Sequence, residues 1–449
     1  MPVTIPAPRT LDPASVPALR WGVIGTGIAD QFVSAIHLRS VQRAVAVTAR
    51  DGEKTRAFAE KHGIPTVHET VETLVADPEV DAVYVSTPHP LHRSQALAAI
   101  AAGKHVLVEK PIAMSADEAR EITEAGRAAG VLVMEAMWAR YLPQADVIRQ
   151  IVESGVLGEL RLVRADFGFS IPFDAESRLW SARLGGGALL DAGVYPISFA
   201  SSVIGSPSQV VASGRVEAAT GVDASADLLL TTSSGARALL STSLETSLPV
   251  EAMILGSEGR LEVHSPFFGP SGLTLTLGSM SSSHESETWE DDAPWPYGSL
   301  AFQATAFASY VAQGLLESPL HPHHEVVSVM ATIDEARRQV AAQAPGAATP
   351  LRHTVAFSLV HEAGSAEEAD FLGSARRILT AIPGVTEFTV SRQVSPKSPL
   401  AWQFSMVFAD REAFAAYDTH PDHVEFVQSR WLSEVADFQE LDLEVSPAP

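Results

Sequence analysis

Cysteine is absent from the 449 residues of this sequence. Disulfide bonds, thiolate catalysis and cysteine metal sites are therefore excluded. Basic residues are scarce as well: 31 Lys and Arg stand against 54 Asp and Glu, which gives a formal net charge of -23. Because nucleic acids and anionic membranes are bound through cationic surfaces, this excess of acid argues against both as partners.

Long hydrophobic runs are also missing. No apolar run approaches the ~18–20 residues that a membrane-spanning helix needs. The first 18 residues are rich in proline and small side chains, and no basic region followed by an apolar core occurs among them. They predict an N-terminal extension over residues 1–18, flexible or lying on the surface, and not a signal peptide. With 46% apolar residues the chain can bury substantial cores, and we expect a soluble, cytoplasmic protein.

What is present falls into three regions. Residues 19–140 alternate short β-branched runs with helical patterns, which predicts an α/β domain with a doubly wound parallel sheet. Residues 141–343 carry longer strand-like runs and predict an α+β domain with a mostly antiparallel open sheet, in which the acidic stretch 279–296 is expected to be a loop. The Pro- and Gly-containing residues 344–350 indicate a linker. Residues 351–449 follow the order β-α-β-β-α-β, which predicts a ferredoxin-like α+β domain.

A pair of glycines follows the first predicted strand, in "GVIGTGIAD". Gly25 allows a tight turn, and Gly27, next to Ile28, lets the backbone approach a pyrophosphate at the start of a helix. The third position of the dinucleotide fingerprint is occupied by Asp30, which departs from the usual small residue. The strand–turn–helix context predicts a dinucleotide site at these residues, with an ordinary turn as the alternative.

The second predicted strand ends in "TARD". At this point of the fold an arginine accommodates the 2′-phosphate of NADP, whereas an acidic residue binds the ribose hydroxyl of NAD. Since Arg50 precedes Asp51, we expect NADP as the preferred cofactor and NAD as the second choice. The alternative is that both residues lie at a solvated helix start.

Polar residues follow the fourth and fifth predicted strands. Ligands of open α/β sheets bind beyond the carboxyl ends of the strands, so we expect Thr87, His92, Glu109 and Lys110 to contact the cofactor. His92 is interpreted as a loop or packing histidine and not as a base. Lys110, held between an apolar strand and Pro111, is expected to be partly desolvated, which can depress the pKa of its amine toward catalytic use. A lysine that merely caps the strand end is the alternative.

At "VEKP" the sequence resembles a known family. Together with the glycine turn, "STPHPLH", "VMEAMWARYLP" and "LGGGALLDAGVYP", residues 20–342 resemble the Gfo/Idh/MocA family of NAD(P)-dependent oxidoreductases, in the branch of dimeric dihydrodiol dehydrogenases and D-xylose dehydrogenases. The resemblance implies a Rossmann domain followed by a sheet domain that carries the substrate pocket. It also implies that Lys110 is catalytic, that the Lys110–Pro111 bond is cis, and that Glu109 supports the cofactor and the lysine.

Asp191 and Tyr195 are the chemically active side chains of the stretch "LGGGALLDAGVYPISFA". The wider family has a histidine four residues after the aspartate, and Tyr195 replaces it here. On a helix the two residues share one face. We hypothesise that Tyr195 exchanges the substrate proton with its pKa lowered by Lys110, while Lys110 polarises the substrate oxygen and Asp191 orients the pair.

The substrate pocket is expected to include Trp138, Arg140 and Trp180, with core packing as the alternative for each tryptophan. The function predicted is hydride transfer between the nicotinamide cofactor and a hydroxyl or carbonyl group of a sugar or cyclic diol. Two alternatives stay open: a cofactor-binding regulatory protein without turnover, and a bifunctional enzyme with a second site near the C-terminus.

That second site would lie in residues 351–449. The stretches "HTVAFSLV" and "AYDTHPDHVEFV" resemble the Dabb family (stress-responsive A/B barrel), whose members pair into dimeric barrels, so a homodimer or a higher homo-oligomer is expected. In some relatives a tyrosine and a histidine of this motif act as acid and base; the matching residues are Tyr417 and His423, with His353 and His420 nearby. The alternative is a dimerisation module without chemistry. No metal site is predicted anywhere in the chain.

Overall fold

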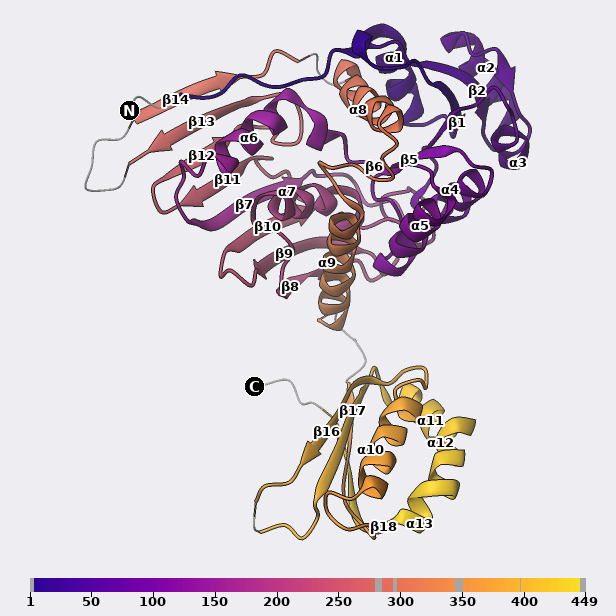
Figure 1. Ribbon diagram of the computed structural model, residues 1–449, viewed down its shortest axis with the longest axis vertical. Helices are drawn as coiled ribbons and strands as arrows, with labels where there is room; N and C mark the ends of the chain where they lie inside the picture. The colour runs from indigo at the N-terminus through magenta and orange to yellow at the C-terminus, as the bar shows by residue number, and fades with distance from the viewer. Residues whose placement is uncertain (1–3, 279–284, 294–296, 344–349, 396, 445–449) are drawn as a thin grey trace. The chain divides into compact units, whose positions relative to one another are not determined.

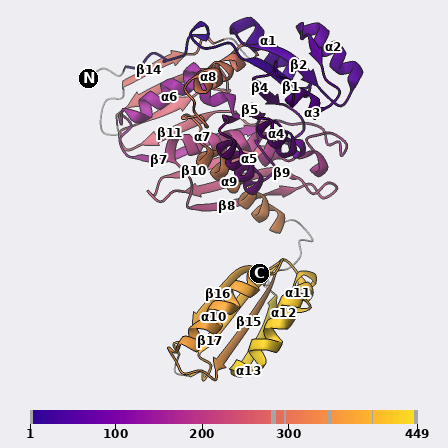
Figure 2. The ribbon, with the colours of Figure 1, turned by 45° about the vertical axis from the view of Figure 1, so that its right-hand side comes forward.

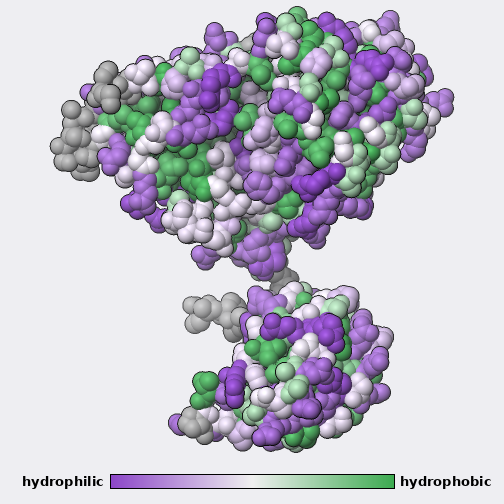
Figure 3. All heavy atoms as spheres, viewed as in Figure 1, coloured by the Kyte–Doolittle hydropathy of each residue, from purple (hydrophilic) through white to green (hydrophobic). Residues whose placement is uncertain are grey.

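The computed structural model of the chain describes residues 4–278, 285–293, 297–343, 350–395 and 397–444 (Figure 1). The chain divides into two compact units, Met1–Ala344 and Pro345–Pro449. Each unit has an apolar core of its own. Hydrophilic and hydrophobic residues are interspersed over the face of each unit drawn in Figure 3.

The first unit begins with a six-stranded parallel sheet in the order β3-β2-β1-β4-β5-β6. The four strands β1, β4, β5 and β6 are buried almost throughout, and helices lie between the strands along the chain, as the alternating pattern predicts. The strand order reverses between β1 and β4, which makes the carboxyl ends of these strands the place where a ligand binds in such sheets. The elements of this region are β1 (Arg20–Ile24), α1 (Ala29–Arg39), β2 (Arg43–Thr48), α2 (Gly52–His62), β3 (Thr66–Val67), α3 (Val71–Val75), β4 (Ala82–Val85), α4 (His92–Ala101), β5 (His105–Glu109), α5 (Ala116–Ala129) and β6 (Val133–Ala136).

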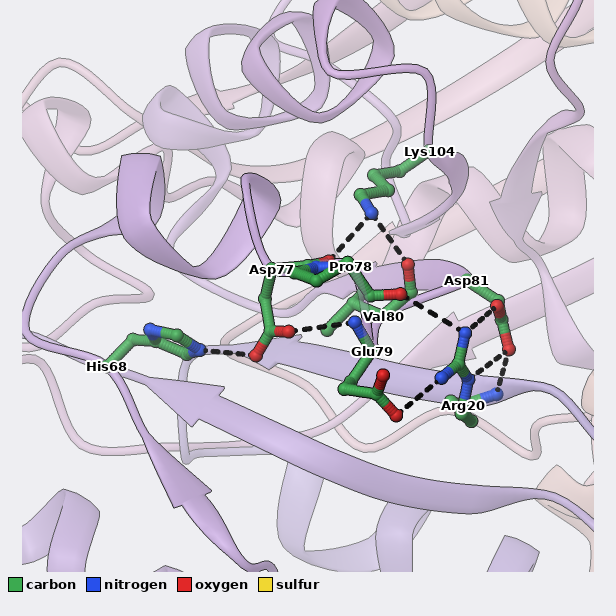
Figure 4. Close-up of polar contacts among 8 residues, drawn as sticks. All are labelled: Arg20, His68, Asp77, Pro78, Glu79, Val80, Asp81 and Lys104. Carbon is green, nitrogen blue, oxygen red and sulfur yellow. Dashed lines mark hydrogen bonds and ion pairs between the residues drawn. The ribbon is translucent and has the colours of Figure 1, made fainter.

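The amino ends of β1 and β4 lie at the other edge of the sheet and are held by a polar network (Figure 4). The Arg20 guanidinium pairs with the Asp81 carboxylate at 2.8 Å. The Lys104 amine donates to the carbonyl oxygens of Asp77 and Val80 at 2.8 and 2.7 Å. Structural contacts therefore occupy this edge, and the opposite edge carries the candidate site.

The second part of the same unit is an eight-stranded sheet in the order β14-β13-β12-β11-β7-β10-β9-β8. Neighbouring strands are antiparallel except β7 and β10, which run parallel. Figures 1 and 2 show α9 beside β8 and β9. The elements are α6 (Pro143–Glu153), β7 (Leu160–Gly168), a π-helical turn (Leu189–Gly193), α7 (Val194–Ile204), β8 (Gln209–Val216), β9 (Asp223–Thr231), β10 (Arg237–Ser243), β11 (Ala252–Gly256), β12 (Gly259–Val263), β13 (Gly272–Leu277), β14 (Glu285–Glu290), α8 (Leu300–Ala312) and α9 (His323–Ala342), with short 3-10 turns at Pro13–Ser15, His89–Leu91, Trp138–Tyr141, Ala182–Leu184 and Tyr297–Ser299.

Strand β14 corrects one expectation. The acidic stretch 279–296 was expected to be a loop, but its central residues pair in register with β13 along the edge of the sheet. Trp289 alternates with exposed polar residues and packs against the core. Charged side chains are common on edge strands because they prevent pairing with another chain. Residues 279–284 and 294–296 of this stretch lie outside the described residues.

The N-terminal extension follows the surface of the second region. The backbone and the guanidinium of Arg9 donate to the Asp146 carboxylate of α6 at 2.7 and 3.0 Å. Within the described residues one helical stretch, Ala182–Ile204, is long and apolar enough to cross a membrane. Of its most apolar 18 residues, 67% are buried inside the unit, as in a core helix.

The C-terminal unit is a four-stranded antiparallel sheet in the order β16-β17-β15-β18, with helices packed on one face (Figure 2). Its core contains the aromatic residues Phe357, Phe371, Phe404 and Phe408. The second helix of the predicted β-α-β-β-α-β order is interrupted at His420–Pro421, since proline cannot continue a helix. The elements are β15 (Leu351–Leu359), α10 (Ala366–Leu379), β16 (Thr386–Arg392), β17 (Trp402–Phe408), α11 (Arg411–Asp418), α12 (Pro421–Phe426), a π-helical turn (Val427–Trp431), α13 (Leu432–Glu434) and β18 (Val435–Glu444).

Candidate active site

The glycine turn after β1 has the geometry of a dinucleotide site. Gly25 has a φ of 102°, and a Cβ atom there would lie 2.8 Å from the carbonyl oxygen of Ser86, so only glycine fits. A Cβ atom at Gly27 would meet nothing within 4 Å, so packing does not require that glycine. Ile28, 40% exposed, caps α1 without a side-chain hydrogen bond. The open space at Gly27 and the helix start fit the pyrophosphate of a bound dinucleotide.

Asp30 does not obstruct this site, because its carboxylate pairs with Lys61 at 2.5 Å and with His62 at 2.8 Å on α2. After β2, the exposed Arg50 precedes Asp51, whose carboxylate accepts the backbone N–H groups of Glu53 and Lys54 at the start of α2. Asp51 is therefore used as a helix cap.

Lys110 directly follows β5, and its bond to Pro111 is cis. The Lys110 backbone N–H donates to the Glu109 carboxylate at 3.2 Å. On the other side Glu109 accepts a short hydrogen bond from the hydroxyl of Tyr84, whose ring stacks on Phe32. A buried network thus fixes the backbone from which the Lys110 side chain extends.

Three side chains from distant parts of the sequence meet at Lys110. Its amine donates to the backbone carbonyl of Asp191 at 2.8 Å and lies 3.9 Å from the Asp191 carboxylate. The same carboxylate accepts a hydrogen bond from Arg178 at 2.9 Å. The Lys110 amine also lies 4.9 Å from the centre of the Tyr195 ring, within the range of a cation–π contact.

Asp191 and Tyr195 do not share a regular α-helix. Asp191 is in the π-helical turn, and Tyr195 is in the first turn of α7. Such turns are frequent at functional sites because they re-aim the backbone and side chains. Here the turn presents the carbonyl of Asp191 to Lys110, which a count of four residues on an ideal helix does not predict.

The phenol of Tyr195 is held in one orientation. The indole N–H of Trp138 donates to its oxygen at 3.0 Å. The ring packs against Phe268 and Phe167, with centroids 4.7 and 5.6 Å away. Since Trp138 is the donor in its bond, the phenol hydrogen can be given to another acceptor.

The sequence led us to expect a lowered pKa for both the Lys110 amine and the Tyr195 phenol, and in the structure both pKa values are raised. Burial alone lowers the pKa of the Lys110 amine, but Tyr195, Asp191 and Glu109 outweigh burial and raise that pKa above its ordinary value. Burial raises the pKa of the Tyr195 phenol, and Lys110 and Trp138 offset only part of this. The pKa of Asp191 is raised by burial but lowered overall by Lys110 and Arg178. The resting site therefore holds an ammonium, a carboxylate and a neutral phenol.

The residues after β4 contact the turn that follows Lys110. His92 is fully buried, and its nitrogens lie 2.9 Å from the Pro111 carbonyl and 2.8 Å from the Thr87 carbonyl. It links the two loops, which fits the packing interpretation, and its contact with the cofactor stays a prediction. The Thr87 hydroxyl donates to Gln95 at 2.6 Å. His89 lies 3.0 Å from the Gly185 carbonyl, and burial lowers its pKa to about 3.

The three candidate substrate contacts have different surroundings. Trp138 contacts Tyr195, as described. Arg140 forms a buried ion pair with Glu325 and donates to Ser198 at 3.2 Å. It borders a cavity of about 720 Å³ that Tyr195 also lines. Trp180 is 2% exposed, and its N–H donates to the Pro172 carbonyl within a small apolar cluster, which matches the packing alternative.

In the C-terminal unit the structure brings Tyr417 and His423 together, with ring centroids 4.4 Å apart. His353 lies 2.7 Å from the Asp442 carboxylate, whereas the His420 ring caps α12. No metal site was predicted, but ligand atoms of His353, Glu440 and Asp442 lie within 4.8 Å of one another. Two of these residues are exposed acids on β18, and His353 already lies within hydrogen-bond distance of one of them, Asp442, across the strands.

The sequence matches known families in three places. Residues 19–137 match the oxidoreductase family with an NAD-binding Rossmann fold, and residues 145–262 match the GFO/IDH/MocA C-terminal domain. Over 334 residues the chain is 33% identical to trans-1,2-dihydrobenzene-1,2-diol dehydrogenase of Mus musculus, covering 73% of this chain and 98% of that protein. The chain belongs to the Gfo/Idh/MocA family. It is an NAD(P)-dependent oxidoreductase. The third match covers residues 351–445, which correspond to the stress-responsive A/B barrel domain.

A further relative and two solved structures resemble the same part of the chain. The diol dehydrogenase of Danio rerio is 35% identical over 333 residues, covering 72% of this chain and 97% of that protein. Among solved structures, a 3-ketoreductase from Actinomadura kijaniata with bound NADP and TDP-benzene is 29% identical, with a TM-score of 0.64 over 72% of this chain and 98% of that one. An aldose-aldose oxidoreductase from Caulobacter crescentus is 25% identical, with a TM-score of 0.64 over 72% and 97% of the two chains.

Sequence reasoning missed two members of the site. Arg178, which pairs with Asp191, lies in an irregular segment with no motif around it. Tyr84, which donates to Glu109, looks like any aromatic residue in a buried strand. Only the pairing of β4 with β5 places Tyr84 beside the strand that ends in Lys110.

Proposed function

We propose that this oxidoreductase transfers hydride between NADP and a hydroxyl-bearing carbon of a sugar or cyclic diol, with Lys110 and Tyr195 handling the proton. The observation that carries the proposal is the convergence of Lys110, Asp191 and Tyr195 beyond β5, in the same unit as the glycine turn. The relatives named above act on a diol, a keto group or an aldose, which supports the substrate class.

The protonation states suit the reduction of a carbonyl group. The bound cofactor supplies the hydride. Lys110, held as an ammonium, would stabilise the negative charge that develops on the substrate oxygen. Tyr195, neutral and oriented by Trp138, would donate its proton to that oxygen. In the direction of oxidation the same phenol must first lose its proton, which the neighbouring Lys110 ammonium favours.

Asp191 keeps the lysine in place. Its carbonyl fixes the Lys110 amine, and its carboxylate, shared with Arg178, balances the buried positive charge. A buried ammonium without such a partner would lose its proton. We therefore assign Asp191 to positioning and charge balance.

The preference for NADP rests on the residues after β2. The Asp51 carboxylate accepts two N–H groups of its own helix, whereas Arg50 is exposed. An arginine at this point can pair with a 2′-phosphate.

A turnover assay tests the proposed function. The protein is incubated with NADP or NAD and a panel that includes D-xylose, other aldoses and trans-1,2-dihydrobenzene-1,2-diol, and formation of reduced cofactor is followed by absorbance. We expect turnover of at least one substrate with NADP preferred, and a loss of about 10²-fold or more in Lys110→Met. Tight cofactor binding without turnover of any substrate would instead support a regulatory protein.

We also propose that the protein forms a homodimer or a higher homo-oligomer through its C-terminal unit. Leu441 and Leu443 of β18 are 47% and 48% exposed. They pair with Thr354 and Arg352 on the sheet face opposite the helices. An exposed apolar strand face of this kind is a common site of association.

A further inference from the structure

Two polar side chains are buried face to face beneath the turn that carries Lys110. Glu135, on β6, is 2% exposed, and its Oε1 atom accepts the backbone N–H of Ile112 at 2.8 Å. Its other oxygen, Oε2, has no hydrogen-bond partner and lies 3.6 Å from Nδ1 of His321. His321 is also 2% exposed, and neither of its ring nitrogens is hydrogen-bonded.

Unpartnered polar atoms are rare in protein interiors because each costs the free energy of desolvation. A separation of 3.6 Å is just beyond a hydrogen bond, so a small shift would join Oε2 of Glu135 to Nδ1 of His321. One proton placed between the two atoms satisfies both. An ionised Glu135 can accept this proton from Nδ1, and a protonated Glu135 can donate it to Nδ1.

The charges around the pair bear on where that proton lies. Lys110, Glu109 and Arg140 face Glu135, and burial raises the pKa of its carboxyl group to about 7 against the opposing effects of the Ile112 N–H, Arg140 and Lys110. Burial, together with Arg140 and His323, holds the pKa of His321 well below its ordinary value. The imidazole therefore stays neutral, and the carboxyl group is the one that titrates.

The backbone around Lys110 has three anchors. Glu109 holds the Lys110 N–H, His92 lies against the Pro111 carbonyl, and Glu135 holds the Ile112 N–H. Glu109 precedes Lys110 directly in the chain, and the ring of His92 is fully buried. The bond from the Ile112 N–H to Glu135 changes strength with protonation, as does the bond from the Lys110 N–H to Glu109, because an N–H bond to a carboxylate is roughly twice as strong as one to a neutral acid. Replacing Glu135 alone separates the two contributions.

We propose that Glu135 is a positioning residue for Lys110, and that the protonation of its carboxyl group, which faces His321, sets how firmly the turn at residues 110–112 holds the lysine amine. This inference rests on the proposed role of Lys110. Ionised Glu135 holds the turn firmly, and protonated Glu135 holds it loosely. Turnover therefore rises with pH through a step that belongs to a residue buried beneath the turn.

The test compares kcat against pH for the wild type and Glu135→Gln. The amide still accepts the Ile112 N–H but does not titrate. We expect the step to disappear, with kcat about 3- to 10-fold below wild type at about pH 8.5 and within about 2-fold at about pH 6, since a partial loss of positioning costs less than the ~10²-fold of a 1 Å displacement. The matched control is Glu317→Gln, an acid that holds the His323 N–H at 2.7 Å on the surface loop and should keep the wild-type profile.

Melting temperature against pH gives a second readout that needs no turnover. A carboxyl group whose pKa is raised in the folded state binds its proton more tightly there, so stability falls as pH rises from about 4.5 to about 7. Glu135→Gln should show a smaller fall. Should Glu135→Gln not fold, His321→Gln removes the other half of the pair and is expected to shift the step in kcat.

The outcomes separate the two proposals. A Glu135→Gln enzyme that keeps the wild-type step, or that loses the same factor at every pH, would overturn the role of Glu135 while leaving Lys110 in place. Retained turnover in Lys110→Met would instead overturn the proposed function itself. Both proposals are supported if the pH step in kcat disappears in Glu135→Gln and turnover is lost in Lys110→Met.

Discussion

Replacing Tyr195 by phenylalanine removes one oxygen atom and leaves the rest of the site in place. The ring would keep its packing against Phe268 and Phe167 and its contact with the Lys110 amine. The variant therefore removes the proton that the phenol gives to the substrate and little else.

The expected effect on the reaction is much larger than the effect on the fold. Loss of a general acid or base costs about 10²- to 10⁴-fold in rate, or roughly 3–5 kcal/mol of transition-state stabilisation. Loss of the hydrogen bond from Trp138 costs about 0.5–1.5 kcal/mol of folding free energy, a melting shift of only a few degrees. Cofactor affinity should not change.

The assay measures kcat, cofactor affinity by fluorescence titration and melting temperature for Tyr195→Phe. The matched control is Tyr141→Phe, which also removes a buried hydroxyl, one bonded to Ser318 at 2.8 Å, and should stay within about 2-fold of wild type. Turnover of Tyr195→Phe within about 3-fold of wild type would refute the assignment, because no general acid contributes so little.

Two further predictions concern the cofactor loop and the C-terminal sheet. Gly27→Ala adds a methyl group that meets no protein atom within 4 Å, so the melting temperature should be unchanged while dinucleotide affinity falls about 10-fold. Gly25→Ala places its methyl group 2.8 Å from the Ser86 carbonyl oxygen at a φ of 102°, so both stability and affinity should fall. Equal effects of the two changes would contradict the assigned roles. Leu441→Glu with Leu443→Glu should lower the solution mass of the full chain by light scattering, because like charges cannot be buried at an interface. An unchanged mass would show that the oligomer forms elsewhere.

The features that the sequence determined are local ones. Strand–helix alternation, the glycine turn after β1 and the lysine–proline step after β5 depend on neighbours a few residues away, and all three lie where the pattern placed them. The core is equally local in origin, because periodic apolar residues face inward wherever the element forms. The acidic composition of residues 279–296 predicted a loop, which was wrong for β14, because pairing with β13 outweighs the low strand preference of its acidic residues.

Tertiary structure decided the chemistry. Burial alone would have lowered the pKa of Lys110, but the fold brings Asp191 and Tyr195, some 80 residues away, to its amine and reverses the direction. The π-helical turn, the arrival of Arg178 and the packing of Trp180 likewise depend on which segments meet. Charge and burial act through space over a few ångströms, so a pattern along the chain can name the reactive residues but does not fix their protonation states.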